Sequence, residues 1–327
     1  MWSVSDCAVQ GRGHKSKQIP CQDKTKVGYK NGTYIISLAD GAGSAKLSQY
    51  GAACVVSSIT ELLTERFEAL YAEEDGRVVK MTILEHIRTA LQREAEAHTC
   101  TLQELASTLL VVAVREERYI IAHIGDGVIG YLDPMGIKVA SAPSNGEHAN
   151  ETYFVTSKDA PAVMKLFKGE CKHISGFVLM SDGTEQSLYN KRTNTCSKAI
   201  IKLMQRNILI TREVMQHQLQ KTFENIIVMQ TQDDCSIALL SRPQGLLRPI
   251  QELSFAERCE VYQISGEDRR CKKRVERYDA IYNALAVPHT CKMLSRRIHL
   301  KPEHTKKHLQ RMVSIGLIQK KAGLYYV

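Results

Sequence analysis

Aspartates stand next to short apolar runs at four widely separated points of the sequence. Asp40 follows residues 35–39, Asp126 follows residues 119–124, Asp182 follows residues 177–180, and Asp233 with Asp234 precedes residues 237–240. Apolar runs of this length, bounded by glycine and polar residues, predict buried strands. Carboxylates at the ends of several strands are the ligands that an all-oxygen site for a divalent metal requires. The spacing therefore predicts a metal site built from distant segments.

The turn after Asp40 is the centre of this pattern. Asp40 is followed by Gly41, Ala42 and Gly43, and glycine lets the backbone come close to whatever Asp40 holds. Taken alone, the same residues fit equally well an ordinary strand-to-helix turn in which Asp40 caps the helix. The other aspartates in the same setting favour the metal-binding interpretation.

The chain of 327 residues is long enough for one large domain and a small one. No apolar run approaches the roughly 20 residues that cross a bilayer, and the first residues lack the basic and then apolar pattern of a signal peptide. The ten cysteines are scattered without a Cys-x-x-Cys pair, which argues against a zinc site or a disulfide framework. We therefore expect reduced thiols, a cytoplasmic location and no membrane contact.

The net charge of +9 lies wholly in the last quarter of the sequence. Residues 255–327 hold 16 Lys and Arg against 7 Asp and Glu, and the remaining residues balance. Such an asymmetry indicates a domain boundary as much as a binding surface.

The elements that must position the aspartates follow from the apolar pattern of residues 1–242. Helical spacing predicts helices at 49–72, 78–98, 196–205 and 212–225. Strands are expected at 1–9, 24–29, from 33 onwards, and at 107–114, 118–124, 128–132, 151–156, 177–180 and 235–241, with a basic, glycine-rich loop at 11–17. Short turns between successive strands, such as the one at 125–127, imply antiparallel pairing. The prediction is an α+β fold, a four-layer α-β-β-α sandwich of two antiparallel sheets flanked by helices.

Beyond this domain the composition changes. Residues 243–254 begin with Pro-Gln-Gly and continue as a polar stretch, which predicts a linker. Residues 255–327 predict helices at 275–286, 291–298 and 302–315, followed by a terminal hairpin. Three helices and a hairpin predict a small winged helix-turn-helix domain.

Six short motifs follow one another in an order typical of one family. They are Pro20-Cys21-Gln22-Asp23, Ala39-Asp40-Gly41-Ala42-Gly43, Ser107-Thr108-Leu109-Leu110, Gly125-Asp126-Gly127, Ser181-Asp182-Gly183 and Asp233-Asp234-Cys235-Ser236. Their order and spacing resemble the metal-dependent protein phosphatases of the 2C type, in particular the bacterial branch. The resemblance covers about residues 1–242.

The resemblance implies two Mg²⁺ or Mn²⁺ ions that share a water, which attacks the phosphorus of a phosphoserine or phosphothreonine. It implies that Asp40 bridges both ions and that the Gly41 carbonyl binds one of them. Asp182 and Asp233 would complete the first ion's site, and Asp23 would act on the second through waters. Asp126 would hold a third, weaker ion together with Asp182.

The sequence departs from the family pattern at three positions. Gln22 stands where the family usually has Glu, Ala42 where many relatives have a histidine, and Gln18 where the phosphate-binding arginine is expected. The substitutes for that arginine are the basic residues Arg12, His14 and Lys17, and the sequence does not choose among them. Either Asp233 or Asp234 could be the ligand, and the family pattern favours Asp233.

These features predict a phosphoserine and phosphothreonine protein phosphatase that acts on a Ser/Thr kinase or on the kinase's target. One alternative is a catalytically weak pseudophosphatase that lacks the usual Glu and His. The other is a DNA-binding regulator, because the basic helix near residues 302–311 could enter a major groove. We slightly favour a tail, residues 255–327, that recruits a protein partner.

Overall fold

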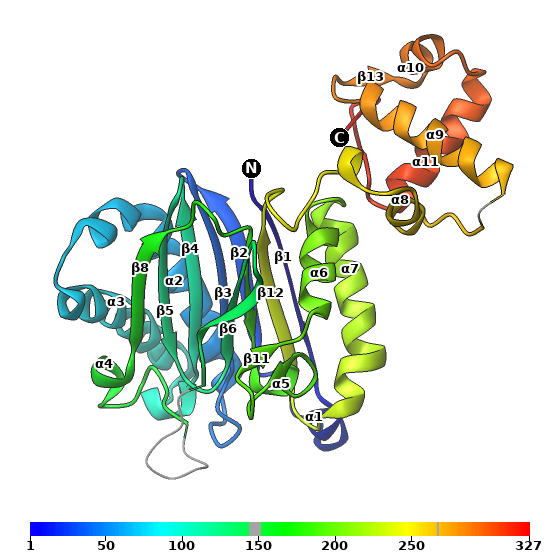
Figure 1. Cartoon of the computed structure of the whole chain (residues 1–327). Coiled ribbons are helices and arrows are strands. Elements are labelled where there is room, and N and C mark those ends of the chain that lie inside the picture. The colour runs from blue at the N-terminus through cyan, green and yellow to red at the C-terminus, as the bar shows by residue number, and fades with distance from the viewer. Residues whose placement is uncertain (144–151, 267) are drawn as a thin grey trace.

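Two antiparallel five-stranded sheets lie face to face in the computed structural model, which describes residues 1–143, 152–266 and 268–327 (Figure 1). The first sheet has the order β2 (Lys24–Lys30), β3 (Thr33–Ala39), β4 (Leu109–Arg115), β5 (Arg118–Ile124) and β8 (Lys165–Glu170). The second has the order β1 (Ser3–Val9), β12 (Cys235–Ser241), β9 (Gly176–Met180), β6 (Val128–Asp133) and β7 (Gly136–Ser141). Apolar side chains of both sheets, among them Ile36, Val112, Phe177 and Leu240, are buried between them.

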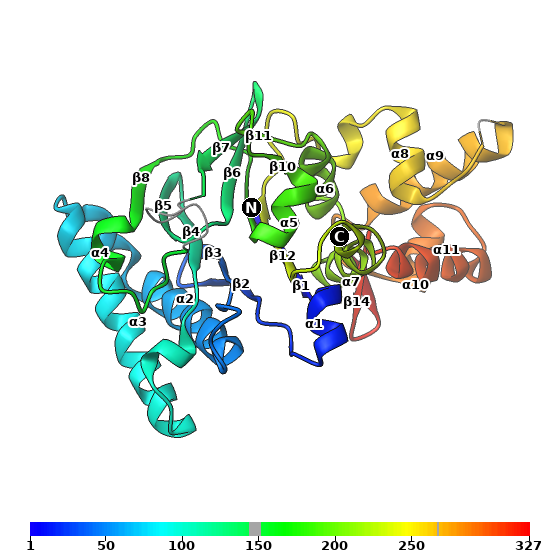
Figure 2. The same ribbon diagram turned by 90° about the horizontal axis from the view of Figure 1, so that it is seen from below.

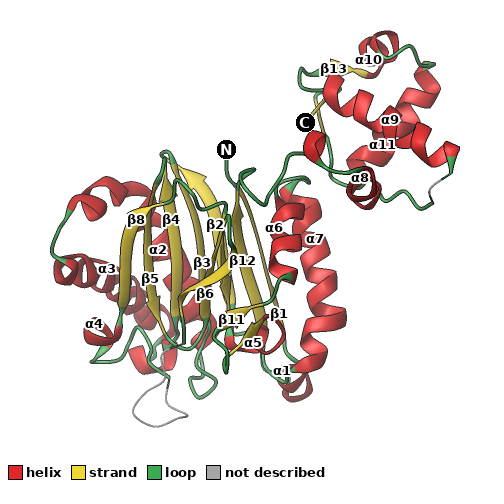
Figure 3. Ribbon diagram, viewed as in Figure 1, coloured by secondary structure: helices red, strands yellow, loops and turns green. Residues whose placement is uncertain are grey.

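Helices cover the outer face of each sheet (Figure 3). α2 (Ser48–Ala72) packs on the first sheet with α3 (Gly76–His98) beside it, and α6 (Ala199–Asn207) and α7 (Arg212–Thr222) pack on the second. The sequence explains this packing, because Val55, Ile59 and Leu63 form a buried stripe along α2. The expected α+β fold with four layers is confirmed.

Residues 11–17 form a short helix, α1 (Arg12–Lys17), so the loop predicted there is wrong. Gly11 and Gly13 lie against the backbone just before β12, where a Cβ on Gly11 would stand 2.3 Å from the carbonyl carbon of Asp233. The two glycines therefore serve close packing between α1 and a segment far away in the sequence, rather than loop flexibility.

β5 and β6 are joined by the turn at 125–127 but belong to different sheets, so the pairing expected between them is wrong. Gly125 has a φ of +117°, and a Cβ on Gly127 would lie 2.6 Å from the carbonyl oxygen of Met180. Glycine at both positions lets the chain cross from one sheet to the other within a few residues. Asp126, between them, is thereby placed where the two sheets meet.

The region 134–176 differs from the expectation. The strand predicted at 151–156 is wrong for residues 152–156, which belong to none of the strands, and residue 151 lies outside the described residues. The region instead contains β7, the short helix α4 (Ala160–Val163) and β8. β8 is an edge strand with charged side chains, which suit an edge but hide the strand from an apolar pattern.

The helix expected from residue 196 begins at Ala199. Cys196 pairs instead with Tyr189 in a two-stranded hairpin of β10 (Tyr189–Asn190) and β11 (Thr195–Cys196). This hairpin directly follows α5 (Asp182–Leu188), the helix that starts at one of the candidate ligands.

The C-terminal region contains the helices predicted for it, and the winged-domain assignment stays a prediction. The elements are α8 (Phe255–Tyr262), α9 (Arg269–Ala284), α10 (Cys291–Arg297) and α11 (Pro302–Ser314), with a small sheet of β13 (His289–Thr290), β15 (Leu324–Tyr326) and β14 (Gln319–Lys321). The sequence did not predict α8 and β13. α9 begins earlier than expected because Asp268 caps it by accepting a 2.8 Å hydrogen bond from Cys271 N.

This region contacts the helices of the second sheet (Figures 1 and 2). Thr211 N donates a 2.7 Å hydrogen bond to Gly316 O, and the Gln205 side chain bonds both the N and the O of Arg248. Within the stretch predicted as a linker, three apolar side chains are buried, those of Leu247, Ile250 and Leu253. Among the described residues no helix is long and apolar enough to cross a membrane.

Candidate metal centre and active site

The first sheet brings three of the aspartates to one edge. Lys24 pairs with Ala39, so Asp23, just before β2, lies beside Asp40, just after β3. The start of β4 pairs with the ends of both β3 and β5, which places Asp126, just after β5, at the same edge. Antiparallel pairing thus gathers residues that are up to a hundred positions apart.

The second sheet contributes the remaining candidates in the same way. Met180 pairs with Ile237, so Asp182, after β9, and Asp233 with Asp234, before β12, lie at one edge. Figure 2 looks onto this end of the molecule, where α1 and α5 lie. The candidate ligands of both sheets therefore meet at the same end of the sandwich.

A pocket of about 180 Å³ lies between these strand ends. Its lining is formed by His14, Gln22, Asp40, Gly41, Ala42, Gly43, Thr108, Asp126, Thr152, Phe154, Asp182 and Asp233. Most of the predicted site residues are therefore brought together, namely Asp40, Gly41, Asp126, Asp182, Asp233 and His14. Asp23 and Asp234 are fully buried, and Arg12 is not part of the lining.

The turn that carries Asp40 is fixed by its neighbour Thr108. Asp40 N donates to Thr108 Oγ1, and Thr108 N donates to Asp40 O, both at 2.8 Å. Gly41 forms a β-bridge with Ser107, and a Cβ on Gly41 would lie 2.8 Å from the Cβ of Ser48. Glycine is therefore required here so that α2 can start close to the turn.

Asp23 is buried with half of its carboxylate unpartnered. Ser236 Oγ donates a 2.7 Å hydrogen bond to Asp23 Oδ2, whereas Oδ1 has no hydrogen-bond partner among the described residues. Burial raises the pKa of Asp23 to about 7, and the nearby carboxylates of Asp234 and Asp182 add to the increase. An orphaned buried carboxylate oxygen is costly unless a cation or an ordered water satisfies it.

The carboxyl groups in the pocket raise one another's pKa. Burial, followed by repulsion from Asp23 and Asp182, raises the pKa of Asp40 well above its ordinary value. Burial, followed by repulsion from Asp233 and Asp126, raises the pKa of Asp182 to about 6. Like charges held this closely favour the neutral form unless a positive charge lies between them.

Asp233 and Asp234 have different surroundings. Asp234 is buried and accepts hydrogen bonds from Gly11 N at 2.7 Å and from Gln22 N at 2.6 Å. Asp233 is exposed and lines the pocket. Asp234 thus holds together the segments around the site. Asp233 Oδ1 accepts a 2.9 Å hydrogen bond from Asp234 N, and the Asp233 side chain faces the pocket, where it could bind a ligand.

The three basic residues of the N-terminal segment are placed differently. His14 lines the pocket, and its Nδ1 lies 3.0 Å from Asp234 Oδ1. Arg12 Nε donates a 3.2 Å hydrogen bond to Thr231 O, whereas Lys17 is exposed. His14 is therefore the basic side chain of this segment that faces the pocket.

The chemistry of the pocket fits hard divalent cations. Its ionisable side chains are mainly carboxylates. Gln22 Oε1 is a further buried oxygen, and it has no hydrogen-bond partner within the part of the chain that the structure describes. In the described ranges no three His, Cys, Asp or Glu side chains already stand as a metal-ligating group. Asp40 and Asp182 instead lie close enough for the charge of Asp182 to raise the pKa of Asp40, and a bound cation would offset this repulsion.

Several residues around the ligands were not assigned a role from the sequence. Thr108 and Ser236 belong to the quoted motifs, and their hydroxyl groups hold Asp40 and Asp23. Thr152 Oγ1 donates a 2.7 Å hydrogen bond to Asp126 Oδ2. Thr152 and Phe154, which also line the pocket, lie in a mixed polar stretch that carries no pattern pointing to the site.

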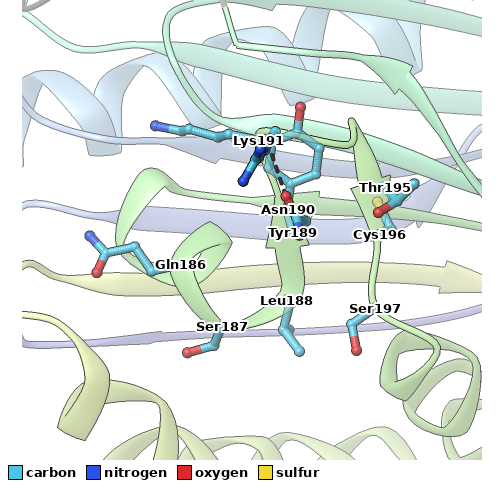
Figure 4. Close-up of a pocket in the computed structure, with 10 residues that line it drawn as sticks. Gln186, Ser187, Leu188, Tyr189, Asn190, Lys191, Thr195, Cys196 and Ser197 are labelled. Carbon is cyan, nitrogen blue, oxygen red and sulfur yellow. Dashed lines mark hydrogen bonds between the residues drawn. The ribbon is translucent and has the colours of Figure 1, made fainter.

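A second hollow of about 520 Å³ lies beside the end of α5 (Figure 4). Gln186 and Ser187 come from α5, and Lys191 and Thr195 come from the hairpin that follows. Lys191 also forms an ion pair with Glu185, whose pKa burial raises to about 7. None of the residues that line this hollow is acidic, so it is distinct from the carboxylate pocket.

Comparison with known proteins decides the family. The family model described as "Protein phosphatase 2C" matches residues 10–224, about two thirds of the chain. The chain belongs to the protein phosphatase 2C family. The match spans five of the six sequence motifs and ends just after α7, whereas the sixth motif, with Asp233 and Asp234, lies just beyond it.

One curated relative supports the same assignment, and solved structures share the fold. Serine/threonine-protein phosphatase 3 of Escherichia coli is 26% identical over 201 residues, which cover 59% of this chain and 78% of the relative. A serine/threonine phosphatase from S. agalactiae superposes with a TM-score of 0.51 at 15% identity over 74% of this chain and all of its own. A bacterial serine phosphatase superposes with a TM-score of 0.52 at 15% identity over 74% of this chain and 98% of its own. The chain is a serine/threonine protein phosphatase with a C-terminal extension.

Proposed function

We propose that this phosphatase uses divalent cations, Mg²⁺ or Mn²⁺, in the carboxylate pocket to hydrolyse phosphoserine and phosphothreonine in proteins. The observation that carries the proposal is the convergence of Asp40, Asp126, Asp182 and Asp233 from the ends of two sheets on one pocket. Their mutual repulsion and the unpartnered Asp23 oxygen favour a cation at this place. Two cations and a third, weaker one suit the number of carboxylates.

The position of each residue in the pocket suggests its role in binding the cations. Asp40, the Gly41 carbonyl, Asp182 and Asp233 would hold the cations directly, with Asp23 acting through waters and Asp126 holding the weaker ion. Bound cations would lower the pKa of a water and neutralise phosphoryl oxygens. Asp234 would position Gly11, Gln22 and His14 around them through its hydrogen bonds and its close approach to the imidazole.

His14 and Arg12 are the candidates that bind the phosphoryl group of the substrate. His14 Nδ1 faces Asp234, which leaves Nε2 for a phosphoryl oxygen or for the leaving serine oxygen. Arg12 is anchored through Nε, which leaves its terminal nitrogens for the same purpose. The two roles are separable, because phosphate binding changes KM and protonation of the leaving group changes kcat.

For the rest of the chain we propose a phosphatase domain at 1–242, a connecting segment at 243–254 and a basic winged-helix domain at 255–327. The C-terminal domain recruits a phosphorylated protein partner, a Ser/Thr kinase or its target. No disulfide joins the cysteines of the described residues, which suits a reducing compartment such as the cytoplasm.

Hydrolysis of a phosphothreonine peptide tests the catalytic proposal directly. The purified chain is expected to release phosphate with Mn²⁺ or Mg²⁺ and to stop when a chelator is added. Activity that persists at full rate in the chelator would contradict the metal requirement. Absence of turnover with either metal would favour the pseudophosphatase alternative, in which Gln22 replaces an expected carboxylate.

A further inference from the structure

The tail contains a pocket of about 520 Å³ between α9 and α11. Its lining includes Arg274, Arg277 and Tyr278 of α9 and Lys307, His308 and Arg311 of α11. None of the described residues that line it is acidic. A pocket of this volume, with basic groups on two opposite walls, has the size and charge of a site for a small anionic group.

Helical spacing explains why the basic groups converge. Arg274 and Arg277 are three residues apart on α9, and Lys307 and Arg311 are four apart on α11, so each pair occupies one face of its helix. Because these two faces line the same pocket, charge that looks scattered in the sequence is gathered in space.

Several of these side chains are held in place. Arg277 Nη1 lies 3.3 Å from His308 Nε2, and the rings of Tyr278 and His308 meet edge to face at 5.6 Å. Arg311 Nη2 donates a 3.0 Å hydrogen bond to Gln263 Oε1. The pocket is thus preorganised, which lowers the entropy lost when a ligand binds.

The positive charge of the pocket is not neutralised by the protein. Among the described residues, no carboxylate forms an ion pair with Arg274, Arg277 or Lys307, whereas Arg258 elsewhere in the tail pairs with Asp279 at 3.6 Å. The charges also act on one another: burial, followed by repulsion from Arg277 and Arg274, lowers the pKa of His308. An anion would relieve this repulsion.

We propose that this pocket binds a phosphorylated serine or threonine on a segment of the partner protein other than the one being hydrolysed. The proposal rests on the proposed function, because it identifies the partner as a phosphoprotein that is held at two points. Arginine matches the geometry of a phosphate group with two parallel hydrogen bonds, and the pocket offers two arginines on α9.

The arrangement favours a phosphopeptide over a nucleic acid. A duplex would contact cations along the whole exposed face of α11, where Lys306 and Lys307 are both exposed, so both lysines would be expected to take part. The pocket instead combines α11 with α9 and leaves Lys306 out. It therefore suits one phosphate group rather than a charged backbone.

The position of the pocket makes it a separate site. The carboxylate pocket lies before β12, and the tail is attached after the end of this strand, at the opposite end of the sheets (Figure 1). A strand of this length spans roughly 20 Å. A phosphate bound in the tail is therefore not within reach of the candidate catalytic residues.

Binding of a fluorescent phosphothreonine peptide to the full-length chain in chelator tests the proposal, because catalysis is then blocked. The double variant Arg274→Gln with Lys307→Gln removes two exposed pocket cations and is expected to weaken binding about tenfold or more. The matched control, Lys272→Gln with Lys306→Gln, removes two exposed cations of the same helices outside the pocket and is expected to bind as the wild type does. The same peptide without phosphate is expected not to bind.

The outcomes are separable from those of the catalytic test. Both double variants are expected to hydrolyse a short phosphopeptide at the wild-type rate. Because the binding assay is run in chelator, a wild-type chain without catalytic activity can still be tested for binding by the tail. Absence of phosphate-dependent binding, or equal binding by the wild type and the pocket variant, would overturn the proposal. Tighter binding of duplex DNA that both double variants weaken equally would replace it with nucleic-acid recognition.

Discussion

At the residue scale, the features of Asp40 that favour cation binding are also the features that make its charged form unfavourable without a cation. Its turn is locked by reciprocal hydrogen bonds with Thr108, so the carboxylate cannot move far from its neighbours. Burial and four nearby aspartates raise its pKa. The same crowding that destabilises the charged carboxyl in the empty protein gives a divalent cation its binding energy.

Asp40→Asn and Asp182→Asn are each expected to lower metal-dependent kcat/KM on the order of 100-fold or more, because each removes a charge that holds the cations. The thermal midpoint of the metal-free protein should stay the same or rise, since an amide removes repulsion. Asp159→Asn is the matched control, because Asp159 is exposed, outside the pocket and free of a side-chain cap hydrogen bond. Near-wild-type activity in both pocket variants would contradict the metal-binding role.

His123 gives a prediction about pH. It is buried in β5 with Nδ1 2.7 Å from Ser141 Oγ, and burial, aided by the positive charge of Lys165, lowers its pKa to about 3. His123 is therefore protonated near pH 6.5 in the unfolded chain but only near pH 3 in the folded chain. The contribution of neutral, buried His123 to the stability of the fold is therefore complete above pH 6.5 and is lost as the pH falls from there towards 3.

His123→Asn removes this titration. Between pH 7 and pH 5 the unfolding free energy of the wild type is expected to fall by about 2 kcal/mol more than that of the variant. Urea unfolding at the two pH values measures this difference. Parallel pH profiles for the two proteins would show that His123 is not buried in its neutral form.

At the scale of elements, α1 acts as a spacer that sets the position of Asp233. Gly11→Ala would put a methyl group 2.3 Å from the Asp233 carbonyl carbon, so α1 or the segment before β12 must shift. We expect kcat/KM to fall on the order of 10- to 100-fold while the far-UV circular dichroism is unchanged. Gly28→Ala is the control, since no atom of the described residues lies within 4 Å of the added Cβ. Equal kinetics for both variants would show that the close contact of α1 does not position the site.

The same elements show how far the sequence predicts the structure. Strands β3, β9 and β12 and the aspartates at their ends could be predicted, because an apolar run and the polar residue that ends it are local signals. The helical form of residues 11–17 could not be predicted, because Gly11 and Gly13 pack against a backbone segment that is more than two hundred positions away in the sequence. The crossing at Gly125 was missed for a related reason: a short turn fits either a hairpin or a change of sheet, and only packing decides between them.

At the scale of the whole molecule, the tail is packed on the phosphatase domain and still leaves the site accessible. Leu209, Ile210 and Met215 around the α6–α7 turn share one apolar cluster with Ile315 and Leu317 of the tail. Removing the tail would expose this surface to water, which costs about 25 cal/mol for each Å² of apolar area.

A chain that ends at residue 242 is therefore expected to unfold at a lower temperature than the full chain. Below that temperature it should hydrolyse a short phosphopeptide with the kcat of the full chain, because no described residue of the tail lines the carboxylate pocket. Scanning calorimetry and steady-state kinetics measure the two effects. A truncated chain that is folded but inactive would show that the tail takes part in catalysis.

The pairing of β1 with β12 also determines when the enzyme can become active. Ser3 lies opposite Ser241, and Asp234 holds the backbone of Gly11. Contacts between residues so far apart form late in folding, because a long loop must close first. On the ribosome the second sheet therefore stays incomplete until β12 has left the exit tunnel. The carboxylate pocket cannot assemble before then, so a nascent chain, or one that terminates before β12, is expected to be inactive towards phosphoproteins.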